Sequence, residues 1–390
     1  MSTKKKILLL TDWYEPGFKA GGPIQSCRNF VRALHDEFEI SIITGDRDHG
    51  DTQPYQGIAA NTWITKDNGV RIWYAGPGTL KPGPLKRLIT AITPDYIYLN
   101  SMYSYHFTLL PLWLKWRKQI AAGIVIAPRG MLQAGAMQFK SGKKKLLLKL
   151  LNTSGLPGKL IFQATDSQEK EDIERYLPSA GKILVIANFP KMNSIPWSPT
   201  PKRPGELHCV FISRLAPKKN LLFLLEVLEN LPDTIRLRLN LYGEIEDQRY
   251  WKKCLSAIEG LPSHITVDWK GSIPNEAVPE VLQQHHIFVL PTKGENFGHA
   301  IFESLALGRP VLISDRTPWR NLESGHTGWD LSLDRPDLFR QSIEKAASFD
   351  QEEYDHWSRS AYLYIKDFVK RSDLKKDYLK LFNQEITRLQ

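Results

Sequence analysis

The chain contains few cysteines and lacks any long apolar run. Its three cysteines, Cys27, Cys209 and Cys254, stand far apart and match neither a disulfide framework nor the spacing of a metal-ligand set. The apolar run near the N-terminus, residues 7–10, is too short for a signal peptide. No stretch approaches the roughly 20 apolar residues of a membrane span. We therefore expect a cytoplasmic protein in a reducing compartment.

The chain also lacks a long polar tract that would indicate disorder. It has 52 Lys and Arg against 42 Asp and Glu, a net charge of +10. This excess favours anionic partners, namely nucleotides, nucleic acid or acidic lipid surfaces, and composition alone does not choose among them. The basic residues do not interleave with aromatic residues as in a recognisable nucleic-acid-binding module, so we expect no nucleic-acid partner.

The length and the apolar pattern predict two α/β domains. A chain of 390 residues is too long for one ordinary core. Short apolar runs alternate with helical patterns in both halves, which predicts parallel sheets covered on both faces. The predicted strands are residues 5–12, 39–45, 95–101, 123–129 and 159–165 in the first half, and 207–215, 237–244, 265–271, 287–292 and 310–315 in the second.

The predicted boundary lies in residues 188–206, which hold five prolines and little periodicity. From Gln351 onward the pattern is polar and helical, with no further strand. Two doubly wound domains create a cleft between the carboxyl ends of their sheets, where ligands of such folds bind. Site residues should therefore follow strands.

Two acids stand out in residues 294–315, after a predicted strand. Gly298 permits a tight turn, and the helix that follows could bind a phosphate at its start, near residues 297–300. Glu303 would lie about one turn into that helix and Glu295 in the loop before it. Both carboxylates could accept hydrogen bonds from sugar hydroxyls on either side of a diphosphate. The alternative is a solvated loop acid and a surface helix acid.

Basic and glycine-bearing loops follow other strands. Arg214, Lys218 and Lys219 lie between a strand and a helix, where they could stabilise the charge on a departing diphosphate without a metal. The alternative is a basic surface loop. Gly21 and Gly22 permit close backbone approach at another helix start, although a plain turn explains this pair as well.

Several features of the first half are candidates for other contacts. His106 and Arg129 each follow a strand and could touch an acceptor, while a lone histidine is often structural. The basic, leucine-rich segment 140–151 could rest on anionic lipid headgroups, or it could be a solvated helix packed by its leucines. Its lysines are Lys140, Lys143, Lys144, Lys145 and Lys149.

No metal is expected. The tripeptide Asp46-Arg47-Asp48 matches the D-x-D pattern of some nucleotide-sugar enzymes, but such tripeptides are common by chance and no further ligands lie nearby. No His or Cys cluster has metal-ligand spacing.

The stretches "GENFGHAIFE" and "SRLAPKKN" together resemble the retaining glycosyltransferases of family 4, which have the GT-B fold of two Rossmann-like doubly wound domains facing across a cleft. The E-x7-E motif of that family matches Glu295 to Glu303. Its basic G-R-L-x-x-x-K-G element matches residues 213–220, with Ser213 and Asn220 in place of the glycines. Residues 21–22, 164–173 and 185–190 also resemble stretches of the family. Many members carry a histidine where this chain has Pro128-Arg129.

The resemblance implies a role for each matched residue. Glu303 would bind the ribose and Glu295 the transferred sugar, while Arg214 and Lys219 would stabilise the leaving diphosphate. Gly22 would approach the donor phosphates. The remaining donor-binding residues would be Asn296, Phe297, Gly298 and His299. The resemblance implies no metal and no other cofactor, since the nucleotide-sugar is a co-substrate.

The resemblance also implies a division of labour along the chain. Residues 1–190 would form the acceptor-side domain and residues 191–363 the nucleotide-sugar-binding domain. Residues 364–390 would form a C-terminal helix that crosses back to the first domain.

We therefore expect a hexosyltransferase that moves a sugar, with retention, from a nucleotide-sugar to a glycan or lipid-linked acceptor. Surface polysaccharide or glycolipid biosynthesis at the inner face of the cell membrane fits the basic charge. An anionic membrane surface is then a further partner. Two alternatives stay open: a nucleotide-sugar 2-epimerase of the same fold, and a non-catalytic nucleotide-sugar-binding protein. Incubation with donor alone separates the epimerase, because an epimerase needs no acceptor.

Overall fold

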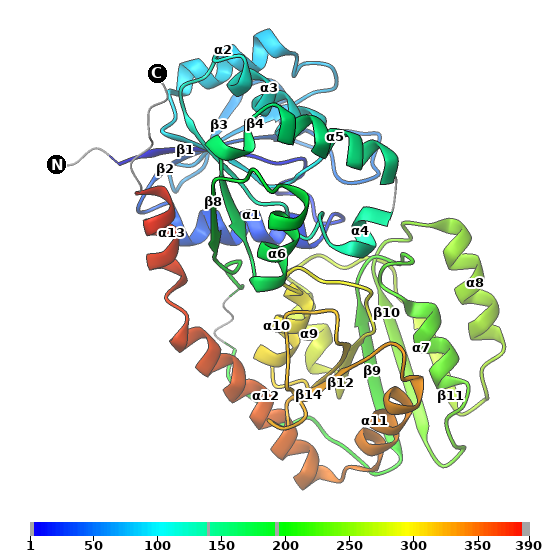
Figure 1. The fold of residues 1–390 in the computed structure, drawn as a ribbon. Coiled ribbons are helices and arrows are strands. Elements are labelled where there is room, and N and C mark those ends of the chain that lie inside the picture. The colour runs from blue at the N-terminus through cyan, green and yellow to red at the C-terminus, as the bar shows by residue number, and fades with distance from the viewer. Residues whose placement is uncertain (1–3, 139–140, 192–194, 384–390) are drawn as a thin grey trace. The chain divides into compact units, whose positions relative to one another are not determined.

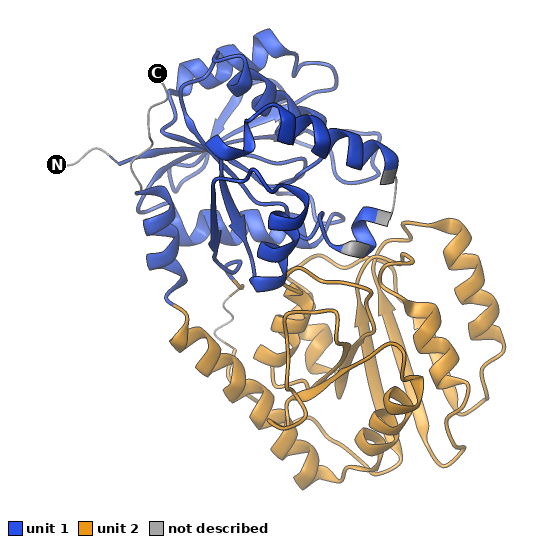
Figure 2. Ribbon diagram, in the orientation of Figure 1, with its two compact units in different colours: residues 1–189, 373–390 blue, residues 190–372 orange. Residues whose placement is uncertain are grey.

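Two separate sheets, one mixed with a single antiparallel pair and one fully parallel, form where the sequence predicts two sets of buried strands (Figure 1). The computed structural model describes residues 4–138, 141–191 and 195–383. Unit 1 comprises Met1–Phe189 and Asp373–Gln390, and unit 2 comprises Pro190–Ser372 (Figure 2). The prediction of two doubly wound α/β units is confirmed.

The sheet of unit 1 has eight strands in the order β3-β4-β2-β1-β5-β6-β7-β8. All neighbours are parallel except β3 and β4, which pair antiparallel at one edge. The strands are β1 (Lys6–Leu10), β2 (Glu39–Gly45), β3 (Trp63–Thr65), β4 (Arg71–Ala75), β5 (Tyr96–Leu99), β6 (Gly123–Ile126), β7 (Ile161–Ala164) and β8 (Lys182–Val185).

Strand β1 explains why the apolar runs of unit 1 do not alternate with polar residues. Its side chains point alternately to the two faces of the sheet, and both faces are covered. Leu8 and Leu10 join one core cluster, while Ile7 and Leu9 join another. The helices of this unit are α1 (Gly22–Leu34), α2 (Pro82–Ile92), the π-helix η1 (Tyr105–Leu109), α3 (Leu110–Trp116), α4 (Ala134–Gln138), α5 (Ser141–Thr153), the 3-10 helix η2 (Pro157–Lys159), α6 (Ser167–Tyr176) and α13 (Leu374–Phe382).

The sheet of unit 2 has six parallel strands in the order β11-β10-β9-β12-β13-β14. The strands are β9 (Glu206–Ile212), β10 (Arg236–Tyr242), β11 (Ile265–Trp269), β12 (Ile287–Leu290), β13 (Val311–Ser314) and β14 (Gly328–Leu331). The helices are α7 (Leu221–Leu228), α8 (Gln248–Glu259), α9 (Val278–Gln283), α10 (His299–Ala306), α11 (Pro336–Ser348) and α12 (Gln351–Arg371). The strand order reverses between β9 and β12, which makes their carboxyl ends the switch point of the sheet.

Four strands were missed by the sequence reading: β3, β4, β8 and β14. Each is short, and all four carry side chains that are partly or fully exposed. The first and last side chains of strand β8 are exposed and the two between them are half-buried. The strand therefore lacks the buried apolar run that marks the central strands. Edge strands depend on the neighbour that pairs with them, and that neighbour is a tertiary feature.

The unit boundaries differ slightly from the predicted domains. The first crossing lies between Phe189 and Pro190, one residue before the predicted boundary. The predicted third segment, 364–390, is divided between the units. Its first residues continue α12 within unit 2, where Tyr364 and Phe368 contact the Trp319 ring. The return to unit 1 is made by α13.

Some predicted features lie outside the described residues. These are Lys140 in the basic segment, residues 192–194 of the linker and residues 384–390 at the C-terminus. None of the helices in the described ranges combines the length and apolarity that a bilayer crossing requires.

Candidate functional site

The loops after β9 and β12 meet because these strands are parallel neighbours. Ile287 and Phe288 of β12 pair with Cys209 and Val210 of β9. Beyond the strands, the backbone N–H of Lys293 donates to the carbonyl of Lys218 over 2.8 Å. The topology therefore joins residues 213–220 to residues 291–298 at the carboxyl edge of the sheet, where ligands of doubly wound folds bind.

The charged groups of the two loops are in direct contact. The Lys219 Nζ donates to Oε1 of Glu295, and the two side chains are only 15% and 13% exposed. Burial raises the pKa of Glu295, but the positive charges of Lys219 and Lys218, the Lys219 hydrogen bond and the charge of Arg214 together hold that pKa below its usual value. Glu295 is therefore ionised at neutral pH and can only accept hydrogen bonds. It is not a solvated loop acid.

The loop that carries Glu295 is anchored from β13 and the segment after it. The Glu295 N–H donates to the carbonyl of Arg316 over 2.9 Å. The indole N–H of Trp319 donates to the carbonyl of Phe297 over 2.6 Å, and the two rings pack at 5.6 Å. No sequence motif marks Arg316 or Trp319, so both were missed.

Helix α10 begins directly after this loop. Its N-cap residue, Gly298, has a left-handed backbone with φ +75°, and a Cβ there would lie 2.8 Å from Cδ1 of Ile301. Gly298 has no side chain with which to cap the first turn, which leaves the positive end of the helix dipole facing the loop. Glu303 follows about one turn later and is 3% exposed. It is therefore not a surface helix acid.

Arg214 lies at the edge of the same site. Its Nη1 donates to Oε2 of Glu246 over 2.6 Å, and both side chains are about one-third exposed. Glu246 follows β10, the other neighbour of β9, and its place after a strand end was the one signal that could have found it. A Cβ on Gly243 would lie 2.0 Å from the carbonyl oxygen of Ser213, so only glycine permits the β9 and β10 ends to approach this closely.

In unit 1, the glycine pair lies at the start of α1. Gly21 is the N-cap, with φ 67° and ψ −119°, a conformation open to glycine alone, and a Cβ there would meet nothing within 4 Å. Asp48 holds the preceding loop, because its Oδ2 accepts the backbone N–H groups of Phe18 at 2.6 Å and Lys19 at 3.0 Å. The D-x-D tripeptide thus supports a loop. Across the described ranges no group of three or more His, Cys, Asp or Glu could hold a metal ion.

The two acceptor-side candidates lie near the carboxyl edge of the sheet in unit 1. The ring of His106 in η1 bonds through Nδ1 to the carbonyl of Leu80 at 2.9 Å. Arg129 follows β6 with φ +56° and donates from Nε to Oδ1 of Asn100 at 2.7 Å and from Nη2 to the Tyr98 hydroxyl at 2.5 Å. Its Nη1 donates to Asn188. These three partners hold the guanidinium within unit 1, and its expected contact with an acceptor stays a prediction.

Residues 198–363 match the family model of the glycosyl transferases group 1. The matched segment makes up most of unit 2. The matched part of the chain includes both loops of the site, with Lys219 and Glu295. The predicted resemblance to glycosyltransferases is therefore confirmed for this group 1 domain.

A curated relative covers a similar part of the chain. The chain is 27% identical over 181 residues to the Escherichia coli O-antigen chain mannosyltransferase B, a match that covers 43% of this chain and 46% of the relative. The chain therefore matches somewhat less than half the length of that protein.

Solved structures match the whole chain in fold. The sucrose-phosphate synthase from Thermosynechococcus elongatus superposes with a TM-score of 0.73 at 16% identity, over 98% of this chain and 99% of the other. Anabaena HepE, solved in complex with UDP and glucose, gives a TM-score of 0.66 at 15% identity, over 97% and 98% of the two chains. At these identities the likeness shows the fold alone, and that fold is GT-B, as predicted.

Proposed function

We propose that the chain is a retaining, family 4 hexosyltransferase that transfers a sugar from a nucleotide-sugar to a glycan or lipid-linked acceptor. One observation carries the proposal: the Lys219–Glu295 contact lies directly before the start of α10, with Glu303 buried one turn further on. This arrangement offers an anion site with a hydrogen-bond acceptor on each side of it.

Donor binding follows from the charges of these groups. A diphosphate is favoured at the start of α10 by the helix dipole. The ribose hydroxyls then lie within reach of Glu303, and the hydroxyls of the transferred sugar within reach of Glu295. Asn296, Phe297, Gly298 and His299 form the backbone between them.

The leaving group sets the role of the basic residues. Transfer breaks the bond between the anomeric carbon and the diphosphate oxygen, and the electron pair stays on that oxygen. The acceptor hydroxyl forms the new bond and its proton passes to the departing phosphate. Lys219 and Arg214 stabilise the charge that develops there, and the Glu295 contact holds Lys219 in place before the donor arrives.

The residues of the acceptor side are predictions from the sequence. We propose a cytoplasmic reaction that builds a surface polysaccharide or glycolipid at the inner face of the membrane. The name of the Escherichia coli relative, an O-antigen chain mannosyltransferase, supports this class of product. Gly22 is a predicted contact of the donor phosphates, and His106 and Arg129 are predicted contacts of the acceptor.

The first test is a thermal-shift screen over UDP-, GDP- and ADP-sugars, in which the true donor raises the melting temperature. Glu303→Ala should then abolish that shift, whereas Lys219→Ala should lower kcat far more than it weakens donor binding. Intact binding by the first variant, or an unchanged rate in the second, contradicts the assigned roles. Epimerisation of the donor without any acceptor would contradict the proposed transferase and support the epimerase alternative.

A further inference from the structure

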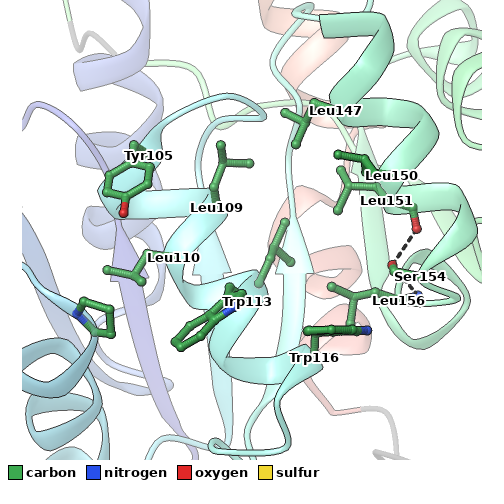
Figure 3. Close-up of a pocket in the computed structure, with 12 residues that line it drawn as sticks. Tyr105, Leu109, Leu110, Trp113, Trp116, Leu147, Leu150, Leu151, Ser154 and Leu156 are labelled. Atoms are coloured by element: carbon green, nitrogen blue, oxygen red, sulfur yellow. Dashed lines mark hydrogen bonds between the residues drawn. The ribbon is translucent and has the colours of Figure 1, made fainter. Parts of the chain in front are cut away.

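Unit 1 carries a pocket of about 460 Å³ that has no part in the site described above (Figure 3). Helix α3 and η1 form one wall, and α5 with the turn after it forms the other. The lining residues are Pro82, Tyr105, Leu109, Leu110, Leu112, Trp113, Trp116, Leu147, Leu150, Leu151, Ser154 and Leu156. Eleven of these twelve residues are leucine, tryptophan, tyrosine or proline, and all of them except Pro82 of α2 belong to η1, α3, α5 or the turn after α5, so the pocket is formed almost wholly by apolar groups.

The rim of the pocket exposes large apolar side chains. Trp113 and Trp116 are 43% and 52% exposed, and Tyr105 is 62% exposed. On α5, Leu150 is 59% exposed. Contiguous apolar surface of this kind marks an interaction site, because single exposed residues scatter whereas these line one opening.

The chemistry of the lining excludes a polar ligand. No lining side chain is charged. The Ser154 hydroxyl donates to the carbonyl of Leu151 over 2.6 Å and accepts the N–H of Leu156 at 3.2 Å, so its hydrogen bonds are made inside the protein (Figure 3). A sugar or a nucleotide would lose its hydration here without replacement, whereas a hydrocarbon chain would not.

Apart from Pro82, all the residues that line the pocket lie in the segment that holds the entire charge excess of the chain. Residues 96–165 contain ten Lys and Arg and no Asp or Glu, a surplus equal to the net charge of +10. Lys145 and Lys149 are exposed on α5, and Arg117 and Lys118 are exposed after α3. The Arg117 guanidinium lies 6.0 Å from the centre of the Trp113 ring. Positive charge thus surrounds the apolar opening.

We propose that this α3–α5 surface, comprising η1, α3, α5 and their pocket, docks on an anionic phospholipid bilayer. A lipid acyl chain enters the pocket, the tryptophans lie at headgroup depth, and the basic residues meet the lipid phosphates. Charge and apolar insertion together give the two signals that stable membrane attachment needs. The inference extends the proposed function, from a lipid-linked acceptor to a lipid surface, and rests on observations independent of the donor site.

Vesicle flotation tests the docking. The full chain should float with vesicles of phosphatidylcholine containing 30% phosphatidylglycerol and not with phosphatidylcholine alone, and binding should weaken as salt rises. Trp113→Ala with Trp116→Ala should lower the affinity at least about tenfold. The matched control, Leu255→Ala with Leu363→Ala, removes exposed apolar groups from unit 2 and should bind as the unaltered chain does.

A second variant pair tests the charge. Lys145→Gln with Lys149→Gln should lower the affinity about tenfold at low salt and flatten the salt dependence. Lys252→Gln with Lys253→Gln removes the same charge from exposed positions of unit 2 and should have a far smaller effect. Equal losses from both pairs would show a general charge effect and overturn the assigned surface.

Insertion depth gives a readout that is independent of the binding affinity. Lipids brominated in their acyl chains should quench the tryptophan fluorescence of the bound chain, and Trp113→Phe with Trp116→Phe should remove most of that quenching while vesicles still bind. Unchanged quenching would overturn pocket occupancy by an acyl chain. A concentration-dependent dimer that the tryptophan variants abolish would assign the pocket to a second copy instead.

Failure of this inference and failure of the proposed function are separable. Donor binding by thermal shift is measured on every variant, and the α3–α5 variants should retain it. A chain that floats but binds no nucleotide-sugar would overturn the proposed function and leave the docking surface. A chain that binds donor but never floats would do the reverse.

Discussion

The Lys219–Glu295 contact is where the site depends on single residues. The two side chains come from loops 76 positions apart in the chain, and each is largely withdrawn from water. A mostly buried ion pair contributes little net stability, because desolvation offsets the attraction, yet breaking it leaves one charge without its partner. The pair therefore serves positioning more than stability.

Glu295→Gln should destabilise the chain by about 3 kcal/mol at pH 7, since Lys219 keeps its charge without a counterion. The pKa of Glu295 is lower in the folded state than its usual 4.5. Its ionisation therefore contributes stability above pH 4.5 that is lost as the pH falls through the lowered folded value. Urea unfolding of both proteins between pH 7 and pH 3 should show the difference shrinking in acid. Glu295→Gln with Lys219→Met should recover part of the loss, and a variant as stable as the unaltered chain would contradict the buried pair.

We expect a second pH effect from His286, whose pKa is shifted chiefly by burial. Burial lowers its pKa to about 4, and the side chain is 3% exposed. Its Nδ1 accepts the backbone N–H of His208 at 2.9 Å, and its Nε2 donates to the carbonyl of Pro201 at 2.8 Å. A proton on Nδ1 would therefore break the hydrogen bond to His208. As the pH falls, His286 takes up this proton in the unfolded chain near its usual pKa of 6.5, and in the folded chain only near pH 4. Stability should thus fall by about 3 kcal/mol between pH 6.5 and 4.

The measurement for His286 is the slope of unfolding free energy against pH. His286→Asn should flatten that slope between pH 6.5 and 4, while His356→Gln, at an exposed position, should leave it unchanged. Equal slopes in all three proteins would show that the proton uptake belongs elsewhere.

Among the elements, the short loop that contains Glu295 and helix α10 after it carry the proposed donor site. The loop is tied to the Arg316 carbonyl and to the Trp319 indole, so its backbone is held from a neighbouring strand end. Helix α10 has only eight residues, and its direction is set at Gly298. The geometry of the anion site thus depends on one left-handed residue.

Gly298→Ala should cost about 1–2 kcal/mol, because a side chain disfavours φ +75° and the new Cβ would crowd Ile301. Donor affinity should fall more than stability does, since a shift of the loop moves the first turn of α10. Gly260→Ala is the matched control: its φ is −85°, and a Cβ there meets ordinary contacts at 3.6 Å or more. Titration calorimetry with the identified donor measures the donor affinity of both variants. A Gly298→Ala variant with full donor affinity would contradict the role of this loop in donor binding.

At the scale of the whole molecule, the chain crosses between its units twice. The second crossing lets α13 complete the core of unit 1, where the Tyr378 hydroxyl accepts from Nε2 of Gln163 at 2.7 Å. Gln163 also accepts from Tyr98, which in turn accepts from Arg129. The last helix is thereby connected to residues of the unit 1 sheet and its carboxyl edge that lie 215 or more positions earlier in the chain.

Phe382→Ala should destabilise unit 1 by about 3–5 kcal/mol, the usual cost of deleting a fully buried ring. The ring packs against Phe30, Phe38, Tyr96 and Tyr98 at 5.5 to 5.8 Å. Donor binding by unit 2 should persist at temperatures where the variant is folded. Lys380→Ala, on the same helix, should cost less than about 0.5 kcal/mol. Denaturant unfolding measures both, and a loss below 1 kcal/mol in the Phe382 variant would contradict the packing.

The sequence by itself determined the strands of the two sheet centres and which charged residues follow them. Apolar runs such as residues 39–45 and 287–292 can only be buried on both faces, and the spacing of Glu295 and Glu303 matches one turn of helix beyond a strand end. Both depend on local periodicity, which the chain carries in each window. The tertiary structure alone decided that β9 and β12 are neighbours, that Glu246 faces Arg214, and that Trp319 holds the loop. These pairings join positions distant in the chain, and only the packing of the sheet brings such positions together.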